Sequence, residues 1–229
     1  MIDLDEKEFY LDAIRDVMPE NKEDQIQAVF YSFLELEYLY DSAIELVKAQ
    51  LNIFDNEFSM RFQRNPIHNV ESRIKTPQSI VDKLQRKNMP LTPESARVNL
   101  TDIAGVRVIS CYIDDIYAIA DLLIKKSGFR LRKTKDYIQN PKSNGYRSFH
   151  MIVDVPVHMS NGQQEAPVEI QIRTIAMDFW ASLEHQLHYK SIGDTKVAAS
   201  LTDELKVYAD IIAETDRKMQ DMFKQINQL

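Results

Sequence analysis

Asp102-Ile-Ala-Gly-Val-Arg-Val-Ile-Ser110 is a short run of mostly apolar and β-branched residues. Such a run predicts a strand buried in the middle of a sheet. Two charges interrupt it, Asp102 at its start and Arg107 inside it. Because a buried charge is costly unless it is paired, two interpretations follow. Either Asp102 and Arg107 form an internal ion pair, or both face a polyanionic ligand, with a metal on Asp102 and a base or phosphate on Arg107.

The composition is that of one globular domain with helical extensions. The chain has 229 residues, of which 44% are hydrophobic. No apolar run approaches the roughly 18 residues that a membrane span needs, and the acidic N-terminus does not resemble a signal peptide. We therefore expect a cytoplasmic protein with no membrane partner. The single cysteine, Cys111, directly follows the run from Asp102 to Ser110 and is expected to lie in the same apolar strand as a buried structural thiol.

The charge is distributed unevenly along the chain. Residues 60–150 carry 17 Lys and Arg against 8 Asp and Glu, whereas the remaining residues carry 11 against 27. Stable nucleic-acid binding needs a broad positive surface, which an acidic chain of net charge −7 does not offer. A basic middle instead favours a local pocket for a small polyanion.

Hydrophobic periodicity predicts both helices and strands around the central run. Helical spacing extends over residues 29–58, 114–126, 174–189 and 201–229. Alternation predicts strands over 129–137, 149–157 and 166–173, and Asn161-Gly162 predicts a hairpin turn before the last of them. The stretch 91–95 is expected to be a loop. Apolar residues of 201–229 form a heptad seam, which predicts packing within the chain or against another subunit.

A basic segment precedes the central run. Arg73 and Lys75 are two residues apart, so they point the same way on an extended chain. The Thr76-Pro77 pair predicts the start of a helix, on which Ser79 and Lys83 share one face. Cations and a hydroxyl beside a helix N-terminus suit an anion, although a solvated basic face would show the same pattern.

An aromatic residue and two cations occur together near residue 146. Tyr146 follows the turn signal Asn144-Gly145, which predicts a loop tip. Lys142 and Arg147 flank it. The ring could plug the surface, or it could stack on a nucleobase beside the two cations.

The strand predicted over 166–173 has two different faces. The core face is apolar and consists of Val168, Ile170 and Ile172. The other face carries Glu169, Gln171 and Arg173, although a solvated sheet face would look the same. On the helix that follows, His185 and His188 are potential metal ligands, but without a third ligand they are weak evidence for zinc.

Four motifs together resemble the RelA/SpoT family of alarmone synthetases. They are Arg73-x-Lys75-x-x-x-Ser79-x-x-x-Lys83, Asp102-Ile-Ala-Gly-Val-Arg107, Lys142-x-Asn-Gly-Tyr146-Arg-Ser-x-His150 and Glu169-Ile-Gln-Ile-Arg173. The resemblance covers roughly residues 60–190, in the order and spacing of the family. The His-Asp pair of the hydrolase domain found in long members is not present. The chain is therefore most similar to the single-domain small synthetases of the RelP type.

This resemblance implies a fold and a reaction. The fold would be α/β (α+β), with a nucleotidyltransferase-like mixed β-sheet flanked by helices. It would comprise an N-terminal helical extension over 1–58, a synthetase domain over 59–190 and an oligomerisation helix over 191–229. The enzyme would be a GTP pyrophosphokinase (GTP diphosphokinase) that moves the β,γ-pyrophosphate of ATP to the 3′-hydroxyl of GDP or GTP. Its products would be ppGpp or pppGpp and AMP, its cofactor Mg²⁺, and its assembly a homo-oligomer, expected to be a tetramer.

The resemblance also implies residue roles on the donor side. Arg73 and Arg107 would sandwich the adenine of ATP. The phosphate-binding residues would be Lys75, Ser79 and Lys83. Cations around aligned phosphates are what phosphoryl transfer requires from a protein, and a planar guanidinium stacks on a base better than an ammonium does.

On the acceptor side, Asp102 and Glu169 would bind Mg²⁺, and Glu169 would also orient or deprotonate the 3′-hydroxyl. Tyr146 would stack on guanine. The remaining acceptor residues would be Lys142, Asn144, His150, Gln171 and Lys135. Some family members have Asn where this chain has Asp178, which argues against a guanine contact there.

Two other functions stay open at this point. One is a catalytically silent nucleotide-binding sensor on the same fold, and the other is a nucleotidyltransferase acting on RNA or a small metabolite. A complete metal and base set argues against the first, and the acidic exterior argues against RNA. Because four separate stretches supply complementary parts of one site, the ion-pair interpretation of Asp102 and Arg107 is disfavoured.

Overall fold

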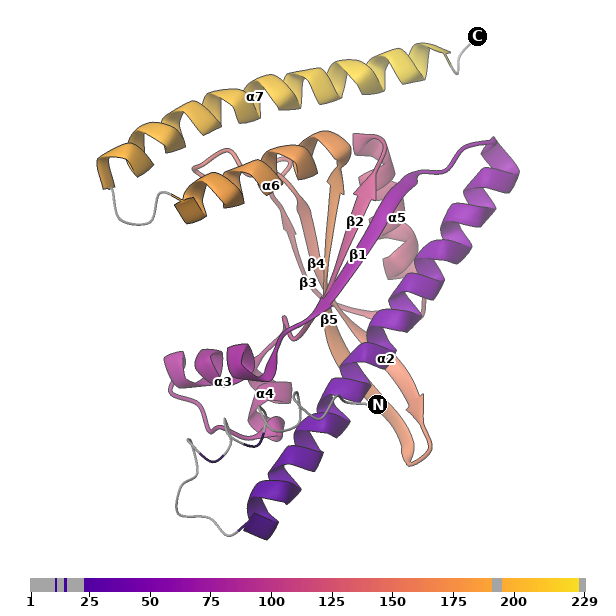
Figure 1. Cartoon of the computed structure of the whole chain (residues 1–229). Coiled ribbons are helices and arrows are strands. Elements are labelled where there is room, and N and C mark those ends of the chain that lie inside the picture. Colours follow the sequence, from indigo (N-terminus) through magenta and orange to yellow (C-terminus); the bar gives the residue numbers. More distant parts are fainter. Residues whose placement is uncertain (1–10, 12–14, 16–22, 191–194, 227–229) are drawn as a thin grey trace. The chain divides into compact units, whose positions relative to one another are not determined.

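The structure, a computed structural model, describes residues 11, 15, 23–190 and 195–226 (Figure 1). None of the helices in this part of the chain combines the length and hydrophobicity that crossing a membrane would require. Of the predicted N-terminal extension, the structure describes residues 11 and 15 and then the chain from residue 23 onward. Leu229, at the end of the predicted heptad seam, lies outside the described residues.

Helices and strands alternate only in part along the described chain, because three consecutive strands and then two helices make up its second half (Figure 1). The helices are α2 (Glu23–Phe62), α3 (Pro77–Arg86), α4 (Pro93–Asn99), α5 (Ile113–Lys125), α6 (Ile175–Lys190) and α7 (Thr195–Ile226). The strands are β1 (Ile67–Ile74), β2 (Ala104–Ser110), β3 (Arg130–Asp136), β4 (Phe149–Met159) and β5 (Gly162–Thr174). The strands pair in the order β1-β2-β5-β4-β3. The predicted α/β fold with one mixed sheet is confirmed.

The described chain divides into two compact units. Unit 1 takes in the residues up to Val47, Ser72–Gly105 and Asp154–Glu169. Unit 2 takes in Lys48–Glu71, Val106–Val153 and the residues from Ile170 onward. The division into 1–58, 59–190 and 191–229 remains a prediction.

The predicted central strand is confirmed as β2. It lies between β1 and β5 in the sheet, and Val106, Val108 and Ile109 are buried as expected of an inner strand. The strand begins at Ala104, so Asp102 stands just before it, in the connection from α4. The predicted hairpin is also confirmed, because the chain turns between the end of β4 and the start of β5.

The loop predicted over 91–95 is wrong, because the helix α4 begins there. Thr92 caps this helix by accepting a hydrogen bond from the Ser95 amide at 3.1 Å, and Pro93 occupies the first turn. A threonine followed by a proline is a helix start signal. The same signal at Thr76-Pro77 correctly predicted α3.

The prediction that Cys111 is a buried strand residue is also wrong. Cys111 follows the last residue of β2 and is half-buried. Its thiol faces the Asn65 carbonyl oxygen at 3.5 Å. Partial burial, reinforced by the negative charge of Asp115, raises the pKa of the thiol. A protonated thiol is a poor nucleophile, so a structural role still fits.

Helix α7 packs against α6 mainly through small residues beside its heptad seam, together with the seam residues Leu205 and Ile212. Within unit 2, α6 and α7 run side by side (Figure 1), and the buried face of α7 consists of Ala209, Ala213, Asp216 and Gln220. Four described seam residues are more than half exposed, namely Tyr208, Met219, Met222 and Ile226. Small residues allow the two helices to approach closely, which leaves most of the described apolar seam on the surface of the single chain.

Candidate active site

The first cluster of predicted site residues centres on Asp102, in unit 1. Its Oδ2 accepts a hydrogen bond from Lys83 Nζ at 2.5 Å and another from Lys75 Nζ at 3.2 Å. Arg107 forms its ion pairs with other carboxylates. The interpretation of Asp102 and Arg107 as an internal ion pair is therefore wrong, and the predicted phosphate-binding lysines converge on the predicted metal ligand.

Backbone geometry brings these three side chains together. The Lys75 amide donates to the Ile103 carbonyl oxygen at 2.8 Å, so the residue after β1 lies beside the segment that holds Asp102. Lys83 comes from α3, which Thr76 caps as predicted by accepting a hydrogen bond from the Ser79 amide at 3.4 Å. The Ser79 hydroxyl also accepts from the Thr76 hydroxyl at 2.9 Å, at the first turn of the same helix.

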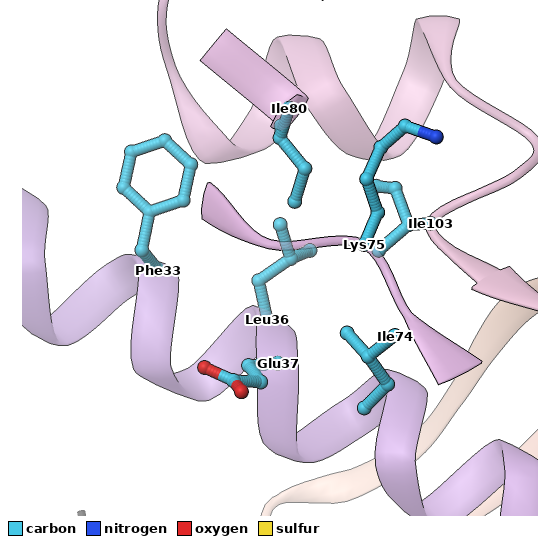
Figure 2. Close-up of a pocket in the computed structure, with 7 residues that line it drawn as sticks. All are labelled: Phe33, Leu36, Glu37, Ile74, Lys75, Ile80 and Ile103. Atoms are coloured by element: carbon cyan, nitrogen blue, oxygen red, sulfur yellow. The ribbon is translucent and has the colours of Figure 1, made fainter. Parts of the chain in front are cut away.

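Apolar packing supports the Lys75 side chain. Phe33 and Leu36 of α2, Ile80 of α3 and Ile103 are buried around a small gap that Lys75 also lines (Figure 2). Figure 2 shows the Lys75 ammonium directed away from this apolar group. The gap has a volume of about 10 Å³, room for about one water molecule. It is a packing feature of the helix and strand and no ligand pocket.

The electrostatics of Asp102 suit a bound cation. Burial acts to raise the pKa of Asp102, but the hydrogen bond from Lys83 and the charge of Lys75 outweigh it, and the net pKa lies below the usual value. The carboxylate is therefore ionised at neutral pH. Its Oδ1 is buried and has no hydrogen-bond partner among the residues that the structure describes. An ionised oxygen in that situation is a suitable ligand for a hard cation such as Mg²⁺.

Glu169, the second predicted metal ligand, lies on β5, the neighbour of β2 in the sheet. It is half-buried between Val168 and Ile170, which are fully buried. Within the described residues, no three or more His, Cys, Asp and Glu side chains gather as a metal site. His185 is exposed on α6, and the His188 side chain lies outside the described residues. Two carboxylates, completed by phosphate oxygens, match the way proteins usually bind Mg²⁺.

The second cluster centres on Tyr146, in unit 2. The Tyr146 hydroxyl accepts a hydrogen bond from Arg173 Nη2 at 2.6 Å and lies 2.9 Å from His150 Nε2. Lys142 Nζ lies 4.6 Å from the centre of the tyrosine ring, and the Arg173 guanidinium lies 5.1 Å from it. The ring is half-buried. Tyr146 lies in the loop between β3 and β4, as predicted, and cations and a histidine frame its side chain.

Helix α7 holds the loop before Tyr146 in place. Gly145 has φ of +92°, and a Cβ atom there would lie 2.6 Å from the Ala209 Cβ, so only glycine fits. Arg147 donates to the Ala209 carbonyl oxygen at 3.2 Å and to Asp210 at 2.7 Å. Asn144 donates to Glu184 at 3.3 Å. The Asn144 amide, predicted to line the acceptor site, thus has a structural contact with α6.

The other predicted acceptor residues surround Tyr146 to different degrees. Gln171 accepts a hydrogen bond from Arg173 at 3.0 Å, which adds it to the cluster. Lys135 is exposed on the edge strand β3, with Nζ 5.9 Å from the Tyr137 ring. The Tyr137 ring in turn lies 6.0 Å from that of Tyr146. Sequence reasoning missed Tyr137, although its position at the end of a basic strand was a usable signal.

Arg173 is the residue whose environment differs most from a solvated sheet face. Its side chain is 7% exposed, and its Nη1 donates to Asp178 Oδ1 at 3.2 Å. Burial of a guanidinium requires partners of this kind. The alternation on β5 identified Arg173 as part of a polar face, but it did not predict the burial or the partner.

The two arginines predicted to hold adenine are both accessible. Arg73 is exposed, and its Cγ lies 3.7 Å from where a Cβ of Gly105 would be, so its side chain follows the start of β2. Arg107 is one-third exposed, with Nη1 3.0 Å from Glu71 and Nε 3.8 Å from Asp178. Sequence reasoning missed Glu71 as a partner of Arg107.

A mixed sheet flanked by helices, with a lysine-bound carboxylate just before β2 and a cation-framed tyrosine in the loop before β4, defines an α/β protein with residues suited to anionic ligands. Residues 72–194 match the family model described as "Region found in RelA / SpoT proteins". This match includes all four motifs. The chain belongs to the RelA/SpoT family.

Three relatives are informative about where in the family the chain falls. The GTP pyrophosphokinase YwaC of Bacillus subtilis is 41% identical over 204 residues, which cover 89% of this chain and 96% of YwaC. The crystal structure of small alarmone synthetase 2 from Bacillus subtilis aligns with a TM-score of 0.73 at 42% identity, covering 82% of this chain and 97% of that one. Small alarmone synthetase 1 from the same organism, bound to its product pppGpp, aligns with a TM-score of 0.71 at 33% identity, covering 82% and 94%.

Proposed function

We propose that this protein is a GTP pyrophosphokinase that makes the alarmone ppGpp or pppGpp. It transfers the β,γ-pyrophosphate of ATP to the 3′-hydroxyl of GDP or GTP and releases AMP. The observation that carries this proposal is the grouping of the motif residues into two sets. One set places two lysines on Asp102, and the other places cations around Tyr146. Because its substrates are cytoplasmic nucleotides, a cytoplasmic location accompanies the proposal.

The first set serves the donor. The ammonium groups of Lys75 and Lys83 contact the Asp102 carboxylate and can instead contact phosphate oxygens when ATP binds. Ser79 lies at the N-terminus of α3, where the helix dipole favours anions. Arg73 and Arg107 are assigned to the two faces of adenine. Most of the catalytic effect in such a transfer comes from aligning and neutralising the phosphates.

The residues also fit a magnesium ion. Asp102 and Glu169 would hold it, since both present carboxylate oxygens and Asp102 Oδ1 has no partner among the described residues. When bound, Mg²⁺ neutralises charge on the phosphate oxygens during transfer. Glu169 has a second role in this proposal, because it accepts or orients the proton of the attacking 3′-hydroxyl.

The second set serves the acceptor. Tyr146 provides the stacking surface for guanine, with its hydroxyl fixed by Arg173 and His150. Lys142 and Lys135 add positive charge for the acceptor's own phosphates. His150 and Gln171 line the same cluster with groups that can form hydrogen bonds to the ribose or the base.

The direct test is to incubate the protein with ATP, GDP and Mg²⁺ and to separate the nucleotides. AMP and ppGpp are expected in equal amounts, and pppGpp should replace ppGpp when GTP is supplied. A silent sensor would bind both nucleotides without forming AMP. Formation of ADP or of a nucleotidylated RNA in place of AMP and ppGpp would contradict the proposal.

Tyr146→Ala is expected to weaken binding of GDP and GTP by about 1–3 kcal/mol, the usual loss for one base–aromatic stack. Titration with guanine nucleotide measures this loss. Tyr146→Phe is the matched control, because it keeps the ring and removes only the hydroxyl that Arg173 holds. The Tyr146→Phe variant should retain most of the affinity for GDP and GTP. Equal losses in the two variants would mean that the hydroxyl matters and the stack does not.

A second prediction concerns assembly. We propose a homotetramer, the assembly that the family resemblance implies. The exposed apolar side chains that support an interface are Tyr208, Met219, Met222 and Ile226 of α7 and Phe179, Leu183 and Leu187 of α6. Large exposed apolar side chains that gather on a surface are typical of interaction sites. Light scattering at micromolar concentration should give four times the chain mass of 26.7 kDa. Met219→Glu combined with Met222→Glu should lower that mass, whereas a wild-type protein of 26.7 kDa would rule out the assembly.

A further inference from the structure

One carboxylate oxygen in unit 2 lies between two arginines from neighbouring strands. Asp178, in the first turn of α6, accepts a hydrogen bond from Arg173 Nη1 of β5 at 3.2 Å. The same oxygen, Oδ1, lies 3.8 Å from Nε of Arg107 on β2. The Asp178 side chain is 17% exposed, so both interactions are partly shielded from water.

The two arginines belong to different parts of the proposed site. Arg107 is assigned to the adenine of the donor. Arg173 is assigned to no ligand, but its Nη2 holds the Tyr146 hydroxyl at 2.6 Å and its guanidinium lies 5.1 Å from the Tyr146 ring. A single carboxylate therefore links a donor-side arginine to the support of the acceptor-side aromatic ring.

The two carboxylate partners of Arg107 differ in how far they are shielded from water. Glu71 pairs with Arg107 at 3.0 Å but is 48% exposed, and an exposed ion pair of this kind contributes little. Asp178 is more shielded and also bonded to Arg173, whose side chain is only 7% exposed. A ligand on Arg107 can therefore displace Glu71 at small cost. The Asp178 carboxylate stays beside Arg107 because Arg173 holds it, although at 3.8 Å it forms an ion pair with Arg107 Nε and not a hydrogen bond.

We propose that Asp178 is a positioning residue that couples the donor and acceptor sites. ATP that immobilises Arg107 also immobilises the shared carboxylate, and through it Arg173 and the Tyr146 ring. Each nucleotide therefore tightens binding of the other by the same factor, because coupling between two sites is reciprocal. This inference rests on the proposed function and assigns Asp178 a role that requires no contact with guanine.

The test measures binding of GDP with and without a saturating, non-hydrolysable ATP analogue, in the presence of Mg²⁺. In the wild type, the analogue is expected to lower the Kd for GDP at least about fivefold, the lower end of typical coupling. The ratio to follow is the Kd for GDP without the analogue divided by the Kd with it. In Asp178→Ala this ratio should fall to near one, while the Kd for GDP without the analogue stays within a few-fold of the wild-type value. Asp178→Asn keeps an acceptor for Arg173 but loses the charge, so an intermediate ratio is expected.

Controls separate coupling from general damage. Asp121→Ala removes an exposed aspartate on α5 that forms an ion pair with Lys125. In this variant, the analogue should lower the Kd for GDP by the same factor as in the wild type. If Asp178→Ala does not fold, as judged by circular dichroism, the near-isosteric Asp178→Asn variant is used in its place. In that variant, the factor by which the analogue lowers the Kd for GDP must be smaller than in the wild type.

The outcomes distinguish this inference from the proposed function. A wild type that binds neither nucleotide refutes the proposed function and the coupling with it. A wild type that binds both without mutual influence refutes the coupling alone, and so does an unchanged ratio in folded Asp178→Ala or Asp178→Asn.

Discussion

Glu169→Gln is expected to bind both nucleotides and to form (p)ppGpp about 10²–10⁴-fold more slowly, the range for loss of a general base. A ribose hydroxyl is a poor nucleophile at neutral pH, so a carboxylate that accepts or orients its proton matters. Glutamine keeps the shape of the side chain on β5 and removes both the base and one charge from the proposed metal site. Release of AMP, followed beside nucleotide titrations, measures the two effects separately.

The same substitution elsewhere on the strand provides the matched control. Glu165 is exposed on β5, so Glu165→Gln should leave synthesis near the wild-type rate. Near-normal turnover in Glu169→Gln would remove Glu169 from the chemistry and leave Asp102 as the one acidic residue supported for it.

Asp102→Asn is expected to reduce synthesis more than about 10²-fold, because a metal contributes several kcal/mol of transition-state stabilisation. Binding of ATP should also lose most of its dependence on Mg²⁺. The fold should survive, since asparagine is nearly isosteric and can still accept hydrogen bonds from Lys75 and Lys83. Asp82→Asn, an exposed change on α3, is the matched control. Unfolding of Asp102→Asn would mean that Asp102 acts mainly as a structural partner of the two lysines.

The pH dependence of stability provides a readout of Asp102 that does not depend on activity. The net pKa of Asp102 in the folded protein is lowered, because the lysine interactions outweigh the effect of burial, which acts in the opposite direction. A lowered pKa means that the ionised side chain stabilises the fold above its unfolded-state pKa and that this contribution is lost as the pH falls. The difference in free energy of unfolding between wild type and Asp102→Asn should therefore shrink on acidification. A difference that grows would contradict the assignment.

Elements that depend on local chain chemistry were predictable from the sequence. The inner strand β2, the β4–β5 hairpin and the capped helix α3 follow from β-branched runs, an Asn-Gly turn and a Thr-Pro pair. Each of these signals acts within a few residues. The incorrect loop predicted at 91–95 is consistent with this, because a local signal for α4 was present in the Thr92-Pro93 pair but was not used.

The choice of partners was not predictable, because it depends on residues far apart in the chain. Asp102 pairs with Lys75 and Lys83, 27 and 19 residues away, and not with Arg107, which lies only five positions along the same run. Likewise, the heptad pattern of α7 identified an apolar face but did not show that the smaller residues around Ala209 would face α6.

The sequence by itself determined strands β2 to β5, the family and the residue types that a pyrophosphate transfer needs, because these are properties of local pattern and spacing, whereas strand β1 was not predicted. Only the tertiary structure decided that Asp102 is held by two lysines, that Tyr146 is framed and half-buried, and that Asp178 lies between two arginines. These arrangements arise when separate strands and helices pack together, and the sequence pattern of any one segment carries no information about which side chain from another segment will meet it.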